Sequence, residues 1–330
     1  MSKMAKRKYI SEFALHMNLT HTMLLQQDDL INVGEYEYFS SENPCHIYMI
    51  CRRPRILIDS TNFVVNSEEI IFAFKIQRQN EYENLELKFP NSYGTNDIKI
   101  ISSFPFNTFE LFKDGNLVLS GKSANLLQYL GTQSTNHLDL EVLYIGQSYG
   151  VEGARTAPDR LQSHSTLQGI YSEAIIKNPD CEIWLLLTSF EKYLLTSMDG
   201  TLKVNDEDME KDTEHLKKVT NTFLSNDLNE QQVINFTEAA LIRYFQPPYN
   251  IEYKNTFPNP AHSTYSECYD LDVNSISIEV NTENVYCQLY STTRKTKWIH
   301  IHDFFLHSKD DRISMFDFEN LLSNNSSTNE

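Results

Sequence analysis

The sequence predicts an α+β fold in which a central region of strands and helices lies between β-rich N-terminal and C-terminal segments. Apolar and polar residues alternate from about residue 35 to 120, and a period of two is typical of half-buried strands. Between residues 140 and 250, apolar runs of strand length are separated by stretches with helical spacing. A chain of 330 residues is long enough for two or three domains.

The N-terminal region, residues 1–110, is expected to form a β meander or a sandwich. Apolar residues alternate at 72–76 and again at 85–89, across a turn rich in Asn and Glu. Just beyond this region, Asp114-Gly115 lies between two apolar runs and indicates a hairpin, because a tight two-residue turn needs positive φ.

The central region, residues 111–258, is expected to hold a strand, a helix, a second strand, an insertion and a second helix. These elements are expected at residues 140–146, 156–178, 181–190, about 191–230 and 235–246. Thr156 and Asp159 are suited to begin the first helix, since their side chains can accept hydrogen bonds from its first backbone N–H groups. Pro247 and Pro248 end the second helix, because proline cannot continue the helical hydrogen bonds.

The C-terminal region, residues 259–330, is expected to return to strands at 276–280, 285–290 and 298–301. A tail rich in Ser and Asn follows from about Leu322, with the composition of a disordered segment. This region is therefore a second β-rich segment beyond the central strands and helices.

Charge, cysteine spacing and hydropathy restrict the classes of function. The formal net charge of −17 is unusual for a protein that binds nucleic acid, because phosphate binding normally recruits a field of Lys and Arg. The five cysteines show no C-x-x-C spacing, which argues against a disulfide framework and against a thiolate zinc site. No apolar run approaches the roughly 20 residues of a membrane-spanning helix. We therefore expect a soluble, cytoplasmic protein.

Five polar residues near the ends of the central elements have the chemistry for phosphodiester hydrolysis. Glu238 is the one carboxylate among them and is expected to bind a single Mg²⁺ or Mn²⁺, since such ions prefer oxygen ligands and retain several waters. Arg160 is suited to a bidentate contact with the scissile phosphate. Tyr144 or His164 is suited to orient or deprotonate the attacking water, and Asn250 to fix its loop through hydrogen bonds to the backbone.

Each of these residues also has a purely structural interpretation. Glu238 stands three residues after Asn235, so it could complete a capping box at the start of a helix. Arg160 and His164 could form an exposed helix face, as any polar pair four residues apart can. A Tyr-Ile-Gly stretch occurs in many buried strands, and Asn250 could terminate a turn. The ordered conjunction of all five residues favours an active site.

In order and spacing, Tyr144-Ile145-Gly146, Arg160 to His164, and Glu238 to Asn250 resemble the second half of the GIY-YIG nuclease signature. The step from Arg160 to His164 is similar to that of the restriction-endonuclease-type members. The resemblance covers about a third of the chain and implies a small three-stranded antiparallel sheet with flanking helices. It also implies a metal-dependent endonuclease that acts on DNA, with restriction or another defence role by analogy.

The resemblance assigns a role to each matching residue. Tyr144 is similar to the tyrosine of the second motif and Arg160 to the catalytic arginine. His164 matches an active-site histidine of the restriction-type members, Glu238 the metal ligand and Asn250 a supporting asparagine. The first motif, Gly-Ile-Tyr, has no clear counterpart, and Tyr129 is the expected substitute for its tyrosine.

Three readings of function stay open at the level of sequence. The first is a cytoplasmic DNA endonuclease that forms a homodimer, because one site of this kind cuts one strand at a time. The second is a catalytically degenerate relative whose acidic surface engages a protein partner. In the third, the protein is unrelated and the matching residues are caps and surface positions, which would then not converge in space.

Overall fold

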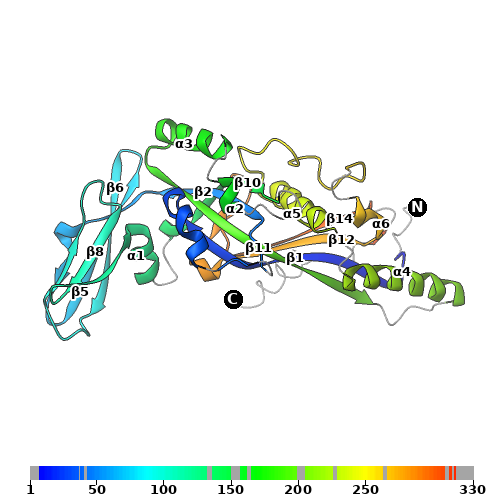
Figure 1. Ribbon diagram of the computed structural model, residues 1–330, viewed down its shortest axis with the longest axis horizontal. Coiled ribbons are helices and arrows are strands. Elements are labelled where there is room, and N and C mark those ends of the chain that lie inside the picture. Colours follow the sequence, from blue (N-terminus) through cyan, green and yellow to red (C-terminus); the bar gives the residue numbers. More distant parts are fainter. Residues whose placement is uncertain are drawn as a thin grey trace, which may run out of the picture.

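A seven-stranded mixed sheet forms the main body of the protein in the computed structural model (Figure 1). The structure describes residues 7–36, 38–40, 43–131, 136–149, 157–161, 165–198, 205–225, 229–262, 266–308, 312–313 and 316. The order across the sheet is β13-β10-β2-β11-β1-β12-β14. These strands are β1 (Ser11–Leu25), β2 (Ile47–Pro54), β10 (Leu140–Gln147), β11 (Cys181–Met198), β12 (Ser275–Asn281), β13 (Leu289–Tyr290) and β14 (Ile299–Phe305).

The expected small antiparallel sheet with flanking helices is wrong. Strands β10, β2 and β11 do pair antiparallel, but the sheet continues beyond β11 through β1, which pairs with it over nearly its whole length. Strand β12 is parallel to β1, and β13 is parallel to β10, so the sheet is mixed. The physical reason lies in the two edges of β11. One edge pairs with β2, and the backbone N–H and C=O groups of the other edge would lack partners without the long strand β1, which hydrogen-bonds to them.

Two smaller sheets are inserted between β2 and β10 and extend from one end of the body (Figure 1). Strands β3 (Ile56–Ile58), β4 (Val64–Val65), β5 (Glu69–Arg78) and β6 (Glu81–Pro90) form one sheet, and β7 (Ile98–Ile101), β8 (Thr108–Lys113) and β9 (Asn116–Lys122) form the other. The hairpin expected at Asp114-Gly115 is confirmed, with φ of 49° and 79° at the two residues. Helix α1 (Ser123–Leu130) then leads back towards β10.

Helices cover both faces of the large sheet. The α-helices other than α1 are α2 (Ala157–Leu161), α3 (Ser165–Lys177), α4 (Asp206–Leu224), α5 (Glu230–Phe245) and α6 (Glu267–Asp270). The 3₁₀ turns are η1 (Gln27–Tyr36), η2 (Ser60–Asn62), η3 (Asn136–Leu138) and η5 (Glu283–Val285). Met49 and Ile50 are consecutive on β2 and therefore point to opposite faces. Met49 belongs to the same apolar cluster as Phe236 of α5, and Ile50 to the cluster of Leu161 and Leu167 from α2 and α3. The end of β10 thus lies between α5 on one side and α2 on the other.

Within the described ranges, no helix is long and apolar enough to cross a membrane.

Candidate active site

Two tyrosines from neighbouring strands form the centre of the candidate site. Tyr48 lies on β2, Tyr144 lies on β10, and Gly146 is the direct cross-strand partner of Tyr48. The two rings are 6.3 Å apart between centroids, and their hydroxyls are hydrogen-bonded. The ring of Tyr48 lies over Gly146, where a Cβ atom would be only 2.5 Å from the Tyr48 Oη. Glycine is therefore the residue that lets the tyrosine pair form.

Burial and neighbouring charges set the protonation of this pair. Burial raises the pKa of Tyr144, the negative charge of Glu238 raises it further, and Arg160 lowers it. Burial likewise raises the pKa of Tyr48. The hydrogen bond between them raises the pKa of Tyr48 and lowers that of Tyr144. Both hydroxyls are protonated at neutral pH.

Arg160 is held at the end of β10 by a backbone carbonyl. It lies on α2, and its Nη1 donates a hydrogen bond of 2.6 Å to the Gln147 oxygen. Its positive charge lowers the pKa of Tyr48, Tyr144 and Glu238 alike, so one guanidinium acts on all three groups. The exposed-face interpretation of Arg160 does not fit this arrangement.

Glu238 approaches the same point from α5. Burial raises its pKa to about 7; Glu252 also raises it, whereas hydrogen bonds from Gln147 and the charge of Arg160 lower it. Helix α5 begins at Glu230 and is capped by Asn229, whose side chain accepts hydrogen bonds from the first turn. Glu238 is therefore in the interior of the helix, and the capping-box interpretation is wrong.

Asn250 holds the chain after α5 against β10. Its side-chain oxygen accepts a hydrogen bond of 2.9 Å from the Ile145 N–H, and its amide nitrogen donates one of 2.8 Å to the Ile145 oxygen. Helix α5 ends at Phe245, as expected from the two prolines that follow. The expected hydrogen bonding of Asn250 to backbone is confirmed, and it braces the strand that carries Tyr144.

The structure brings together Tyr144, Arg160 and Glu238, with Asn250 beside them. His164 lies outside the described residues. Tyr129 lies on α1 with 80% of its surface exposed, and in the described part of the chain no hydrogen bond or ion pair links it to the other site residues.

Tyr48 is the site residue that the sequence analysis missed. The signal in the sequence is His46-Ile47-Tyr48, which differs from the Gly-Ile-Tyr of the first motif only by histidine in place of glycine. The two inserted sheets separate it from Tyr144 along the chain, whereas β2 and β10 are adjacent in the sheet.

The donor set at the site suits a hard cation with few protein ligands. The described residues contain no group of three or more His, Cys, Asp or Glu side chains that could hold a metal ion. The carboxylate of Glu238 is the kind of oxygen ligand that Mg²⁺ prefers, and Mg²⁺ retains most of its waters.

Comparison with known proteins does not add to this picture. No family model, no curated protein and no solved structure matches the chain. The case for a function therefore depends on the chemistry of the site itself.

Proposed function

We propose that this protein is a metal-dependent endonuclease that hydrolyses phosphodiester bonds in DNA. The observation that carries the proposal is the meeting of one arginine, one carboxylate and a tyrosine pair at the end of β10, where Arg160 acts on the other three groups. Such a set matches the charge pattern of phosphoryl transfer, in which negative charge grows on the phosphate oxygens.

Arg160 supplies the fixed positive charge. Its bond to the Gln147 carbonyl uses one nitrogen and leaves other guanidinium N–H groups to contact non-bridging phosphate oxygens. Because the guanidinium is already oriented, little reorganisation is needed as charge develops in the transition state. Loss of this residue should lower the rate of the chemical step more than the affinity for DNA.

Glu238 is the residue that would hold Mg²⁺ or Mn²⁺. The metal, when bound, neutralises charge on the phosphate and on the leaving oxygen. Binding requires the ionised carboxylate, and a pKa of about 7 means that protons compete with the metal below neutral pH. The site should therefore bind metal more tightly at pH 8 than at pH 6.

The tyrosine pair positions the attacking water. One of the two hydroxyl hydrogens is used in the hydrogen bond between Tyr48 and Tyr144, so the other is directed to another acceptor, and a water beside the phosphate is a suitable one. Neither tyrosine is a resting base, because burial raises the pKa of both. His164, outside the described residues, is kept as a candidate for accepting the proton of the water.

Cleavage of supercoiled plasmid DNA with Mg²⁺ or Mn²⁺ tests the proposal. We expect the wild type to cut, and Arg160→Ala and Glu238→Ala each to lose at least about a hundredfold in rate. Each variant must retain the thermal unfolding midpoint of a folded protein. A folded wild type that cuts no DNA or RNA with either metal would contradict the proposal and favour the degenerate binding protein instead.

Tyr48→Phe and Tyr129→Phe together test which tyrosine takes the place of the first-motif tyrosine. Removing the hydroxyl deletes the hydrogen bond to Tyr144 while keeping the packed ring, so we expect about a tenfold to hundredfold loss of cleavage and little loss of stability. Tyr129→Phe, at an exposed position on α1, should cut at the wild-type rate. Unchanged cleavage in Tyr48→Phe, or lost cleavage in Tyr129→Phe, would reverse this assignment.

We further propose a homodimer that acts in the cytoplasm. One site cuts one strand per event, so cutting both strands needs two copies or two encounters. All five cysteines are free and four of them are buried, which suits a reducing compartment. The plasmid assay reports the dimer directly, because paired sites convert supercoiled DNA to linear DNA without accumulation of nicked circles.

A further inference from the structure

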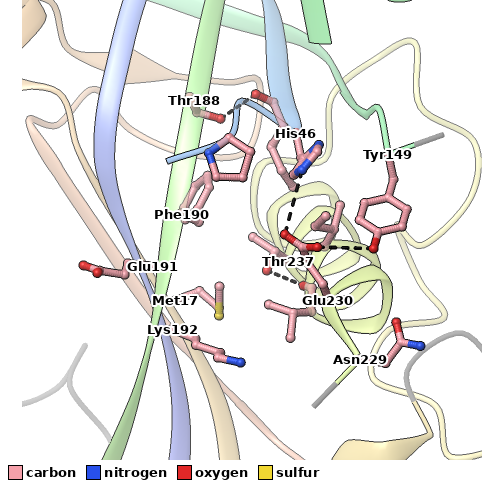
Figure 2. Close-up of a pocket in the computed structure, with 14 residues that line it drawn as sticks. Met17, His46, Tyr149, Thr188, Phe190, Glu191, Lys192, Asn229, Glu230 and Thr237 are labelled. Carbon is pink, nitrogen blue, oxygen red and sulfur yellow. Dashed lines mark hydrogen bonds and ion pairs between the residues drawn. The ribbon is translucent and has the colours of Figure 1, made fainter. Parts of the chain in front are cut away.

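A pocket of about 490 Å³ opens on the α5 side of β2, and its lining includes none of Tyr48, Tyr144, Arg160 and Glu238 (Figure 2). It lies between β1, β2 and β11 on one side and the first turns of α5 on the other. A volume of this size lies within the range of small-molecule binding sites. The pocket is large enough for one nucleobase with its sugar left outside.

The pocket adjoins the site through both strands that carry the tyrosines. His46 immediately precedes β2, and its Nδ1 donates a hydrogen bond of 2.7 Å to the Ser148 oxygen. The Ser148 N–H donates back to the His46 oxygen at 2.8 Å, so the two strands stay paired beyond Gln147. Tyr149 lines the pocket only two residues after Gln147, a step of about 7 Å in an extended chain.

The walls of the pocket suit an aromatic ring. Tyr149 and Phe190 supply aromatic surface, and Met17, Val233 and Ile234 supply apolar surface. Figure 2 shows Phe190 and Met17 on the side of the pocket opposite Tyr149. Stacking on aromatic side chains is the usual way in which proteins hold an unpaired base.

The polar groups of the pocket argue against a phosphate. The Glu191 carboxylate points away from the pocket in Figure 2, which leaves the carboxylate of Glu230 beside one lysine, Lys192, whose pKa is lowered by burial. Glu230 accepts a hydrogen bond of 3.2 Å from the Tyr149 hydroxyl, and its other oxygen lies 4.0 Å from the His46 Nε2. The occupant should thus be uncharged and should present N–H donors to Glu230.

We propose that this pocket binds an unstacked guanine next to the scissile phosphate and so gives the nuclease a base preference. Guanine presents two adjacent N–H donors on its Watson–Crick edge, which match the two oxygens of Glu230, whereas thymine presents one donor between two carbonyls. Tyr149 stacks on the ring. This inference rests on the proposed nuclease function, because it identifies the occupant by the site that adjoins the pocket.

Binding of short single strands in EDTA, where no metal-dependent cleavage occurs, tests the pocket by itself. The probes are fluorescent pentathymidine and the same strand with one central guanine, measured by anisotropy. We expect the guanine strand to bind at least tenfold more tightly to the wild type. Tyr149→Ala should weaken its binding about tenfold through lost stacking, and Glu230→Gln should reduce the preference for guanine.

Matched variants keep the result interpretable. Tyr129→Ala removes an exposed tyrosine and Glu207→Gln an exposed first-turn glutamate of α4, and both should bind both strands like the wild type. Val233→Phe fills the pocket and should abolish the preference even if Tyr149→Ala loses stability. Equal binding of the two strands by the wild type would overturn the proposal that the pocket binds guanine.

The two proposals fail in distinguishable ways. If the protein cleaves DNA with metal but shows no preference for guanine in the EDTA binding assay, the guanine-pocket proposal is overturned and the nuclease proposal is retained. If the protein prefers guanine through Tyr149 and Glu230 but cleaves no nucleic acid, the guanine-pocket proposal is supported and the nuclease proposal is overturned.

Discussion

Glu238→Gln is expected to abolish metal-dependent cleavage and, at the same time, to raise the free energy of unfolding at pH 8. The glutamine keeps the shape of the side chain and its packing within α5, but it removes the negative charge that a metal needs. The same substitution removes the cost of holding an ionised carboxylate in a largely buried position. Function and stability should therefore move in opposite directions at this one residue.

The pH dependence of this effect follows from the pKa of the carboxyl group. In the folded protein that pKa is raised to about 7, so the folded state holds the proton more firmly than the unfolded chain does. Stability contributed by the protonated carboxyl is fully present below the unfolded pKa and is lost as pH rises towards 7. Above pH 7 the ionised group costs about 3–4 kcal/mol, since the pKa rises from 4.5 to about 7 and each pKa unit corresponds to about 1.4 kcal/mol.

Urea unfolding at pH 4.5 and pH 8 measures this difference. The wild type should lose more stability between the two pH values than Glu238→Gln does, by on the order of 2–3 kcal/mol. Glu214→Gln, an exposed glutamate on α4, should follow the wild type at both pH values. Equal pH dependence in the wild type and in Glu238→Gln would mean that the carboxyl group is not perturbed by burial.

Gly146→Ala is expected to disrupt the tyrosine pair with a single methyl group. The new Cβ would lie 2.5 Å from the Tyr48 Oη and 2.7 Å from the Tyr144 Cε1, and real Cβ contacts are not that short. Both rings must move within a packed region, which typically costs about 1–3 kcal/mol. Because the hydroxyls move with the rings, cleavage should fall by about a hundredfold or more.

Gly169→Ala is the matched control. Gly169 lies inside α3, and a Cβ there would meet nothing within 4 Å. Alanine is the better helix former, so this substitution should raise stability by about 0.5–1 kcal/mol and leave cleavage unchanged. Thermal unfolding and plasmid cleavage of the two variants check the pair. A Gly146→Ala protein with wild-type rate and stability would contradict the close packing of Tyr48 over this glycine.

Local features of the fold were predictable because they depend on residues close together in the chain. The Asp114-Gly115 turn follows from the positive φ that a tight hairpin needs, and the end of α5 follows from Pro247 and Pro248. The hydrogen bonding of Asn250 to backbone was predictable from its side-chain chemistry. The choice of Ile145 as its partner was not, because Ile145 is on a distant segment.

The sequence alone predicted the strand at 140–146, the end of α5 and three candidate groups of the site, namely Tyr144, Arg160 and Glu238. The tertiary structure alone decided that β1 extends the sheet beyond β11, and that Tyr48 lies against Gly146. It also decided that Glu238 is interior to a helix that starts at Glu230, since Asn229 rather than Asn235 caps that helix. The physical reason is that periodicity and capping depend on residues close together in the chain. Strand pairing joins backbone groups of distant segments, and the sequence of one segment does not show which other segment it will pair with.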